Sequence, residues 1–502
     1  MRIGEAAFDS RRLAELVPLG EAAFRERRGR SAGPRTEVAA AFVAYLRRLG
    51  APEAALKAAR RLARPGVPVV ATGQQAGLLG GPALTFYKAH SALGRAGREG
   101  VAVFWVASQD HDTEEVAGLC LLDRSERLLA ERLPLPVGPP VGRIPFAPYR
   151  ERLKAWLADF DGDPEAKAAV LAALAPAAGY AEAFARLLVF AFGERGLLPL
   201  DPMAPEFAPL FVPLLARELD DPLGSVAALA EGAVALKARG FRPTLGRPPG
   251  ATNLFLEDEE GTRRLLFYRR GRFWDGRRSY TRADLRAVLE ADPARLTPAA
   301  ALRPVFQDAL LASAGFVVGP GELAYVAELA PVYRHHGVPM PAVLPRLRAV
   351  VVEPPVARIL ARYRLDAWRA AEDPEAALDA RLAGLLAEAS GAEAALERAR
   401  AAVGEAEARL AAFEPTLVPA AGRVRRRLDA EFERLFKKLA RARRNRQSVL
   451  AAQAERLQKH LRPCGKPQEA ALPYLNFYLK HGERALFALA EAPLSGRAVI
   501  AL

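Results

Sequence analysis

The sequence contains a dense polar cluster, Gln109-Asp110-His111-Asp112, which directly follows an apolar run. Two carboxylates beside a histidine could bind a metal ion, orient an amine, or exchange a proton near neutral pH. The simpler alternative is an acidic cap for the following helix, because Asp and Glu are favoured in first helical turns. We favour the functional interpretation, because so many polar groups directly after a buried strand are costly unless they are used. Asp110, His111 and Asp112 are therefore candidate catalytic residues.

A second cluster combines glycines with amide side chains in the segment TGQQAG at residues 72–77, and more glycines follow it. Glycine lets a ligand approach the backbone closely, and the N-terminus of a following helix offers free N–H groups to an anion. The spacing matches neither the GxGxxG nor the Walker pattern, so a turn that needs glycine only for its geometry stays an alternative. The candidate ligand-binding residues are Thr72, Gly73, Gln74, Gln75, Gly77 and Gly81, and two candidate catalytic residues follow them, Lys88 and His90.

A third, weaker pattern lies between residues 303 and 325. A Gly-Pro-Gly break at a strand end, followed by an acid in the first turn of a helix, is typical of a pocket rim. The alternative is a surface pair on one helix followed by an ordinary turn. The candidate binding residues of this segment are Arg303, Gln307, Asp308, Gly319, Gly321, Glu322 and Tyr325.

The elements around these clusters predict how they meet. The β-branched run at residues 67–73, a glycine loop, a helix over 83–98 and the run VAVFWVA at 101–107 form a βαβ unit. Further buried strands are expected at 197–200, before Gly319, and at 340–346. Such a unit begins a parallel, doubly wound sheet, and ligands bind at the carboxyl ends of its strands. The three polar clusters are therefore expected to meet in one cleft, which is a stronger signal than any single motif.

Other parts of the chain predict insertions and an arm. Residues 119–146 are typical of a hairpin insertion, 148–240 of helices, and 250–282 of a small antiparallel meander. From residue 373 apolar side chains recur in steps of three and four, break at 413–416, and resume toward residue 460. This pattern predicts an antiparallel coiled-coil hairpin. We expect a catalytic core over residues 1–355, an arm over 356–460, and a segment 461–502 that returns to the core.

Composition narrows the functional classes. Half of the 502 residues are hydrophobic and no run reaches about 18 uninterrupted apolar residues, so no membrane span is expected. The first residues lack the apolar core of a signal peptide, and a cytoplasmic location is expected. The net charge of +14 is concentrated in local basic runs without interleaved aromatics, so nucleic acid is not an expected partner. Cys120 and Cys464 form no CxxC zinc motif, and no metal ligands are assigned.

Five segments together resemble the BshC family. They are TGQQAGLLGGPALTFYKA, FWVASQDHDTEEV, RPVFQDALLASAGFVVGPGELAYVAEL, MPAVLPR and CGKPQE. Their order runs from near residue 67 to near residue 480, and the first three are long and specific. The resemblance implies the last step of bacillithiol synthesis, in which L-cysteine is joined to glucosaminyl malate.

The resemblance also implies an α/β fold: a Rossmann-like parallel-sheet core related to class I aminoacyl-tRNA synthetases, with insertions and an antiparallel coiled-coil arm that forms a homodimer. The turn from Gly73 through Lys88 and His90 then takes the place of the synthetases' nucleotide-binding signature. Arg346 lies near the place of their second, lysine-rich signature. ATP is the cofactor that this resemblance implies, with Mg²⁺ as the metal ion that would accompany its phosphates.

We therefore expect an ATP-dependent ligase that joins the carboxylate of cysteine to the sugar amine of glucosaminyl malate. A carboxylate reacts with an amine only after its oxygen becomes a leaving group, and adenylation is the economical route. Two alternatives stay open. One is another nucleotidyl-transferase-like or tRNA-modifying ligase on the same core, and the other is a non-catalytic scaffold that recruits partners through its coiled coil.

Overall fold

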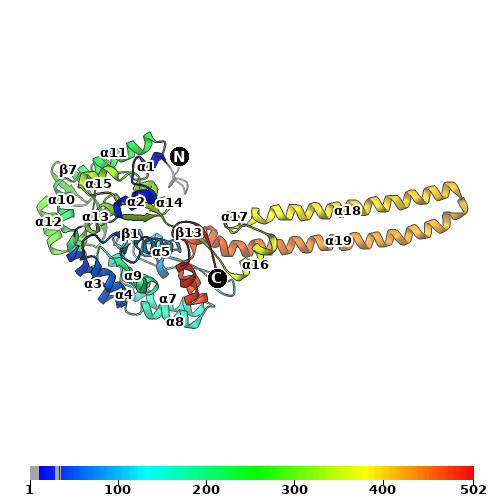
Figure 1. Ribbon diagram of the computed structural model, residues 1–502, viewed down its shortest axis with the longest axis horizontal. Helices are drawn as coiled ribbons and strands as arrows, with labels where there is room; N and C mark the ends of the chain where they lie inside the picture. The colour runs from blue at the N-terminus through cyan, green and yellow to red at the C-terminus, as the bar shows by residue number, and fades with distance from the viewer. Residues whose placement is uncertain (1–10, 29–32, 34) are drawn as a thin grey trace. The chain divides into compact units, whose positions relative to one another are not determined.

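The computed structural model describes residues 11–28, 33 and 35–502. The chain divides into two compact units (Figure 1), of which the first comprises Met1–Ala349 with Glu469–Leu502 and the second comprises Val350–Gln468. Among the described residues, no helix is both long enough and apolar enough to cross a membrane.

A parallel five-stranded sheet is the centre of the first unit. Its strands lie in the order β12-β11-β1-β2-β5, and every neighbouring pair is parallel. The strands are nearly continuous apolar runs, as expected where helices cover both faces of a sheet. The predicted strands and the βαβ unit are thus confirmed. Their bounds are β1 (Val69–Gln74), β2 (Val101–Val106), β5 (Leu197–Leu200), β11 (Gly315–Val318) and β12 (Ala342–Pro345).

Helix α5 (Leu84–Ala96) connects β1 to β2 and packs on both strands. It ends at Gly97, whose φ of 66° suits a residue without Cβ. Helix α4 (Glu53–Arg61) contacts β2 and β5, and helix α2 (Gly20–Arg28) contacts β12 at the other edge of the sheet. The other helices before β5 are α1 (Arg11–Ala14), α2 (Gly20–Arg28), α3 (Thr36–Arg48), α4 (Glu53–Arg61), α6 (Thr113–Val116), α7 (Ala147–Asp159), α8 (Pro164–Leu174) and α9 (Tyr180–Phe192).

Two antiparallel elements are inserted into this frame. The predicted hairpin is β3 (Gly118–Leu122) with β4 (Leu128–Arg132). The predicted meander is a second sheet of order β10-β6-β7-β8-β9, in which β10 is a strand that the sequence did not indicate. Its strands are β6 (Ala251–Glu257), β7 (Arg263–Arg269), β8 (Arg272–Trp274), β9 (Ser279–Tyr280) and β10 (Leu296–Pro298). The helices around this sheet and after it are α10 (Val212–Asp220), α11 (Gly224–Ala238), α12 (Arg282–Ala291), α13 (Arg303–Leu311), α14 (Pro320–Val326) and α15 (Ala330–His336).

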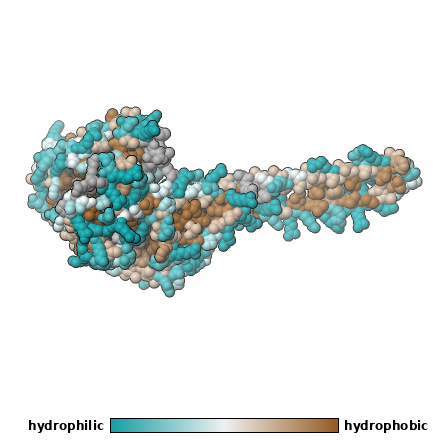
Figure 2. All heavy atoms as spheres, in the orientation of Figure 1, coloured by the Kyte–Doolittle hydropathy of each residue, from teal (hydrophilic) through white to brown (hydrophobic). Residues whose placement is uncertain are grey.

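The second unit consists mainly of two long helices, α18 (Pro374–Phe413) and α19 (Val418–Leu461), which lie side by side (Figure 1). A short turn over Pro415–Leu417 joins them, so the predicted antiparallel hairpin is confirmed. Apolar side chains follow the line where the two helices meet (Figure 2). Ion pairs cross between the helices, for example Arg400 with Asp429 at 3.1 Å. The unit also contains α16 (Pro354–Tyr363) and α17 (Ala367–Glu372), and the remaining elements of the chain are β13 (Leu347–Val352), α20 (Gln468–Ala471), α21 (Leu475–His481), α22 (Glu483–Ala490) and β14 (Gly496–Ala501).

A prediction concerns Gly73, which pairs in register with Trp105 of the neighbouring strand. A Cβ at Gly73 would lie 2.8 Å from the carbonyl oxygen of Trp105, a backbone atom that can move only if β1 or β2 moves. Gly73→Ala should therefore lower the free energy of unfolding by about 1–3 kcal/mol in a denaturant titration. Gly321→Ala is the matched control, because no atom lies within 4 Å of its Cβ. It should be neutral or stabilise by up to about 1 kcal/mol. Equal effects of the two substitutions would contradict this account.

Candidate active site

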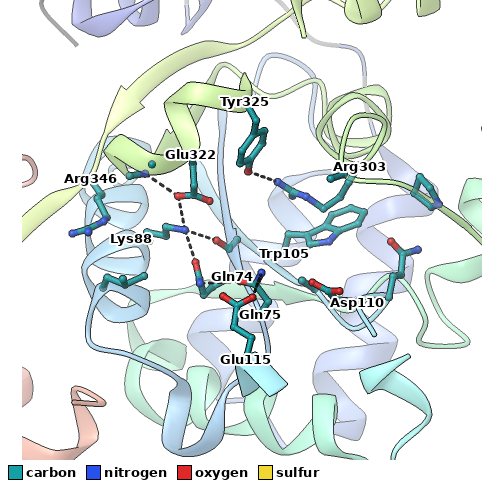
Figure 3. A pocket seen from close by; sticks show the side chains of 18 of the residues that line it. Gln74, Gln75, Lys88, Trp105, Asp110, Glu115, Arg303, Glu322, Tyr325 and Arg346 are labelled. Atoms are coloured by element: carbon teal, nitrogen blue, oxygen red, sulfur yellow. Dashed lines mark hydrogen bonds and ion pairs between the residues drawn. The ribbon is translucent and has the colours of Figure 1, made fainter. Parts of the chain in front are cut away.

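One cavity of about 520 Å³ lies at the carboxyl edge of the parallel sheet (Figure 3). Gly73 and Gln74 line it from the end of β1, Ala107 from the residue after β2, and Gly319 from the residue after β11. This is the edge where open α/β sheets bind ligands, and the volume is ordinary for a ligand pocket. The candidate residues that the structure brings to this pocket are Gly73, Gln74, Gln75, Lys88, Asp110, Arg303, Gly319, Gly321, Glu322, Tyr325 and Arg346.

Lys88 lies at the bottom of the pocket and is 1% exposed. Its ammonium group donates to the carbonyl oxygen of Gly73 at 2.9 Å and to Oε1 of Gln74 at 2.6 Å, and it pairs with Oε2 of Glu322 at 2.6 Å. Burial lowers the pKa of Lys88, while the carboxylate of Glu322 raises it. An ammonium group has three N–H donors, so all three have acceptors within the protein. Lys88 therefore joins the end of β1 to α14 (Figure 3) and has no donor left for a ligand.

Two carboxylates form an acidic wall of the pocket. Asp110 follows β2 and accepts a hydrogen bond from the backbone N–H of His111 at 2.8 Å. Glu115 belongs to the short helix α6 and accepts from Nε2 of Gln75 at 3.2 Å. Burial raises the pKa of Glu115, and the charges of Asp110 and Asp112 raise it further. A carboxylate whose pKa is raised is a better proton acceptor, so this wall can hold an ammonium group or take a proton from an amine.

His111 lies beside the pocket lining and is held by Arg263. Nη1 of Arg263 is 3.1 Å from Nδ1 of His111, and the imidazole ring packs near Phe255. Burial and the charge of Arg263 lower the pKa of His111, which favours the neutral ring. Because an arginine can only donate, Nδ1 accepts this bond and the ring proton lies on Nε2. His111 can then donate a hydrogen bond through Nε2, which leaves proton abstraction to the carboxylates.

Two arginines from the parallel-sheet region line the pocket in different states. Arg346 makes a bidentate pair with Glu469, with two N–O distances of 3.0 Å. Arg303 lies with its Cζ atom 5.7 Å from the centre of the Trp105 ring, and its two side-chain hydrogen bonds, to Gln307 and Tyr325, are long at 3.4 Å. Arg346 is therefore neutralised by a protein carboxylate, whereas Arg303 is held by an aromatic face and weak bonds.

The second sheet supplies a wall that the sequence did not predict. Arg247, Phe255, Arg263 and Pro298 all line the pocket, and they come from the second sheet and the segments beside it. Arg263 lies against the face of Phe255, with its Cζ atom 3.9 Å from the ring centre. The only available signal was the arginine content of the meander, and arginines are equally typical of a solvated strand face. Trp105, inside an apolar strand, was missed because it resembled a core residue.

His90 is not part of this pocket. It is two positions after Lys88 on α5, a spacing that turns its side chain to another face of the helix. There it is buried, with Nε2 2.9 Å from the carbonyl oxygen of Ala492 and Nδ1 3.5 Å from Arg195. Burial lowers the pKa of His90. The structure therefore places His90 in a packed position apart from the other candidate residues.

Three residues of the glycine-rich segment make contacts within the fold and do not line the pocket. Oγ1 of Thr72 donates to the carbonyl oxygen of Val317 at 2.8 Å and so fastens β1 to β11. A Cβ at Gly77 would lie 2.8 Å from Cα of Gly81, so these two glycines allow a close backbone crossing. Thr72, Gly77 and Gly81 do not line the pocket, and their contacts fit the turn interpretation.

Gln307, Asp308 and Asp112 likewise lie outside the pocket lining. Asp308 is buried, accepts a hydrogen bond from the Tyr333 hydroxyl at 2.5 Å, and has its pKa raised by burial to about 6. Gln307 donates to Asp308 at 3.3 Å and accepts from Arg303, so both residues stand behind that arginine. Asp112 caps α6 by accepting from the backbone N–H of Glu115 at 3.3 Å, as the alternative interpretation expected. Among the residues that the structure describes, no group of three His, Cys, Asp or Glu side chains could hold a metal ion.

Two family models match nearly the whole chain. Residues 19–347 match "Bacillithiol biosynthesis BshC, N-terminal Rossmann-like domain". Residues 349–498 match "Bacillithiol biosynthesis BshC, C-terminal coiled-coil domain". The two descriptions agree with the parallel sheet of the first unit and the long helices of the second.

Full-length relatives agree with the family models. A protein of Thermus thermophilus is 53% identical over 492 residues, which cover 97% of this chain and 98% of the relative. A protein from another strain of the same species is also 53% identical and covers 91% of this chain and 92% of its own length. A protein of Symbiobacterium thermophilum is 33% identical, with 90% and 87% covered. All three carry the name "Putative cysteine ligase BshC". The chain therefore belongs to the BshC family of bacillithiol biosynthesis, through both its Rossmann-like and its coiled-coil domain.

Proposed function

We propose that this protein is a cytoplasmic ligase that forms an amide bond between the carboxylate of L-cysteine and the amine of glucosaminyl malate, the last step of bacillithiol synthesis. The names of its relatives support the cysteine ligase activity. The observation that carries the proposal is the pocket, in which the carboxylates of Asp110 and Glu115 share one cavity with several arginines. Such a cavity suits substrates that carry an amine and several carboxylates.

The acidic wall is assigned to the amine. The ammonium form of a sugar amine would pair with Asp110 or Glu115. One of these carboxylates would first take a proton from the ammonium group. The neutral nitrogen would then attack the cysteine carbonyl carbon, the activated oxygen would leave, and the other carboxylate would accept the second proton that nitrogen loses. Positioning the amine beside the activated carboxylate also removes most of the entropic barrier of a bimolecular reaction. His111 lies beside the pocket lining and accepts a hydrogen bond from Arg263, so it would act by positioning that arginine.

Activation of the carboxylate is assigned to ATP, which would transfer a phosphate-containing group to one carboxylate oxygen and so turn that oxygen into a leaving group. Arg303 fits the phosphates, because no carboxylate oxygen of the described residues lies within 4.0 Å of its guanidinium group. Lys88 does not fit this task, because its three donors are used by Gly73, Gln74 and Glu322. Lys88 is instead a positioning residue that fixes the floor on which the reactants lie.

A homodimer through the coiled-coil unit is part of the same proposal. Several large apolar side chains of α18, α19 and the turn between them lie on the surface of the hairpin. Phe413 is 85% exposed, Val424 58% and Leu435 46%. A second copy of the hairpin would cover such a stripe, and exposed stripes of this kind mark protein interfaces.

The first prediction of this proposal concerns the two carboxylates of the acidic wall. Asp110→Asn and Glu115→Gln should each lower kcat/KM for ligation by about 100-fold to 10,000-fold, because each removes an amine partner or proton acceptor. Liquid chromatography with mass spectrometry of the thiol product measures this. The matched control is Glu114→Gln, whose side chain is exposed and pairs with Arg132 outside the pocket. Wild-type turnover in both pocket variants would remove these carboxylates from the mechanism.

The second prediction is a pH profile. Because the pKa of Glu115 is raised, this carboxyl group keeps its proton at higher pH than an ordinary glutamate. The ionised base is thus present at high pH and is lost as pH falls through the raised pKa. A plot of kcat/KM against pH should fall on its acidic side above the usual range of carboxyl groups. Glu115→Gln should abolish this limb, and an unchanged limb in that variant would assign it to another group.

A further inference from the structure

Arg247 and Arg263 form a positive wall that the second sheet presents to the pocket. Arg247 lies in the segment before β6, and Arg263 begins β7 and is only 9% exposed. No carboxylate oxygen of the described residues lies within 4.0 Å of either guanidinium group. This distinguishes the two residues from Arg346 in the same pocket, which is paired with Glu469.

The hydrogen bonds of Arg263 all go to neutral acceptors. Nε donates to Oγ1 of Thr297 at 3.0 Å, and Nη2 donates to the carbonyl oxygen of Pro298 at 3.0 Å. Nη1 donates to Nδ1 of His111. With one side of its plane on Phe255, this guanidinium group is held rigidly, and the carboxylate of Asp110 stabilises its charge from beyond ion-pair distance. Burial lowers the pKa of Arg263 to about 10, the charge of Asp110 opposes this shift, and the charge of Arg247 adds to it.

Arg247 is fixed by a chain of buried side chains. Its Nε atom donates to Oδ1 of Asn253 at 2.8 Å, and Nδ2 of Asn253 donates to Oγ of Ser225 at 3.0 Å. The Ser225 hydroxyl in turn donates to the carboxylate of Glu218. Because the serine proton is used by Glu218, Asn253 must present its oxygen to Arg247. The two terminal nitrogens of Arg247 have no acceptor among the described residues, which leaves them for a ligand.

Two like charges in a partly buried wall repel each other and lose hydration, which is unfavourable unless an anion joins them. We propose that Arg247 and Arg263 bind a doubly charged acid, namely the two carboxylates of the malyl group of the acceptor. This assignment rests on the proposed function. It places the dicarboxylate on the arginine wall and the sugar amine on the acidic wall of Asp110 and Glu115. One acceptor molecule then spans the cavity in a single orientation.

The geometry favours carboxylates over the phosphates of a nucleotide. Guanidinium groups match planar carboxylates through two parallel N–H donors, and here two separate guanidinium groups stand ready for two carboxylates. The two arginines also belong to the inserted sheet and the segment before it, whereas Arg303 lies on α13, at the edge of the parallel sheet. A nucleotide on Arg303 and a dicarboxylate on the other two arginines would therefore occupy different walls.

The test measures anion binding and does not require turnover. L-malate is titrated calorimetrically into the wild type, Arg247→Gln and Arg263→Gln. Loss of one charge-assisted pair should raise the Kd for malate about 10- to 100-fold in each variant. The matched control is Arg264→Gln, the next residue of β7, whose side chain points to the other sheet face and pairs with Asp258 at 2.5 Å. Its Kd should stay within about threefold of wild type.

Parallel titrations with inorganic phosphate and with ATP identify the source of the anion. If the two pocket variants lose affinity for phosphate and ATP but not for malate, the wall serves the nucleotide and the proposal is overturned. Unchanged malate affinity in Arg247→Gln overturns it as well, because this half-buried residue can be replaced without filling or emptying the core. Thermal melting of Arg263→Gln checks that its effect is not a loss of fold.

Kinetics then separate this inference from the proposed function. With glucosaminyl malate as the acceptor, both variants should raise KM far more than they lower kcat, whereas its dimethyl ester should be used equally by wild type and variants. If the wild type binds malate through these arginines but forms no amide, the malate subsite is supported and the ligase proposal is refuted. If the wild type forms the amide with equal kcat/KM for the acid and the ester, the ligase proposal is supported and the malate subsite is refuted.

Discussion

The pocket depends on the buried ammonium group of Lys88. This group ties the end of β1 to the first turn of α14, since its three acceptors are Gly73, Gln74 and Glu322. Burying a charge is unfavourable unless every donor is matched, and here each N–H has an acceptor. Oε2 of Glu322 also accepts from the backbone N–H of Gly319, so the same interaction fixes the break after β11. One side chain thus holds the two strand ends at a fixed separation.

The positions of the other pocket residues depend on these two strand ends. Because β2 lies next to β1 in the parallel sheet, the cluster after β2 must reach the same edge, and Asp110 enters the cavity beside Gln75. The second sheet meets the cavity with cations, at Arg247 and Arg263. Groups of opposite charge at different places in one small cavity orient a ligand that carries both charges, and they repel the reversed orientation.

The sequence predicted the parallel sheet and the meeting of its polar clusters because both follow from local patterns. Apolar runs of strand length and the glycine breaks after them are readable residue by residue. It could not decide between Lys88 and His90, although helical periodicity shows that only one of them can face the pocket. The place of Arg263 in the pocket could not be predicted from the sequence. It depends on how the inserted sheet packs against the parallel sheet, and no local sequence pattern indicates that contact. Asp112 was a candidate because it adjoins Asp110, and the structure shows its side chain capping α6 outside the pocket lining.

The residues assigned to catalysis and those assigned to acceptor binding lie on different parts of the first unit. The groups assigned to activation and proton transfer lie beside the parallel sheet: Asp110 follows β2, Glu115 lies on α6 and Arg303 begins α13. The arginines assigned to the acceptor lie on an insertion that contributes its own buried side chains, such as Asn253, and contacts the cavity through one edge. An insertion of this kind can change its charges while the strand ends keep their places. The choice of acceptor is then separable from the chemistry of amide formation, because the two are carried by sheets with independent hydrogen-bond ladders.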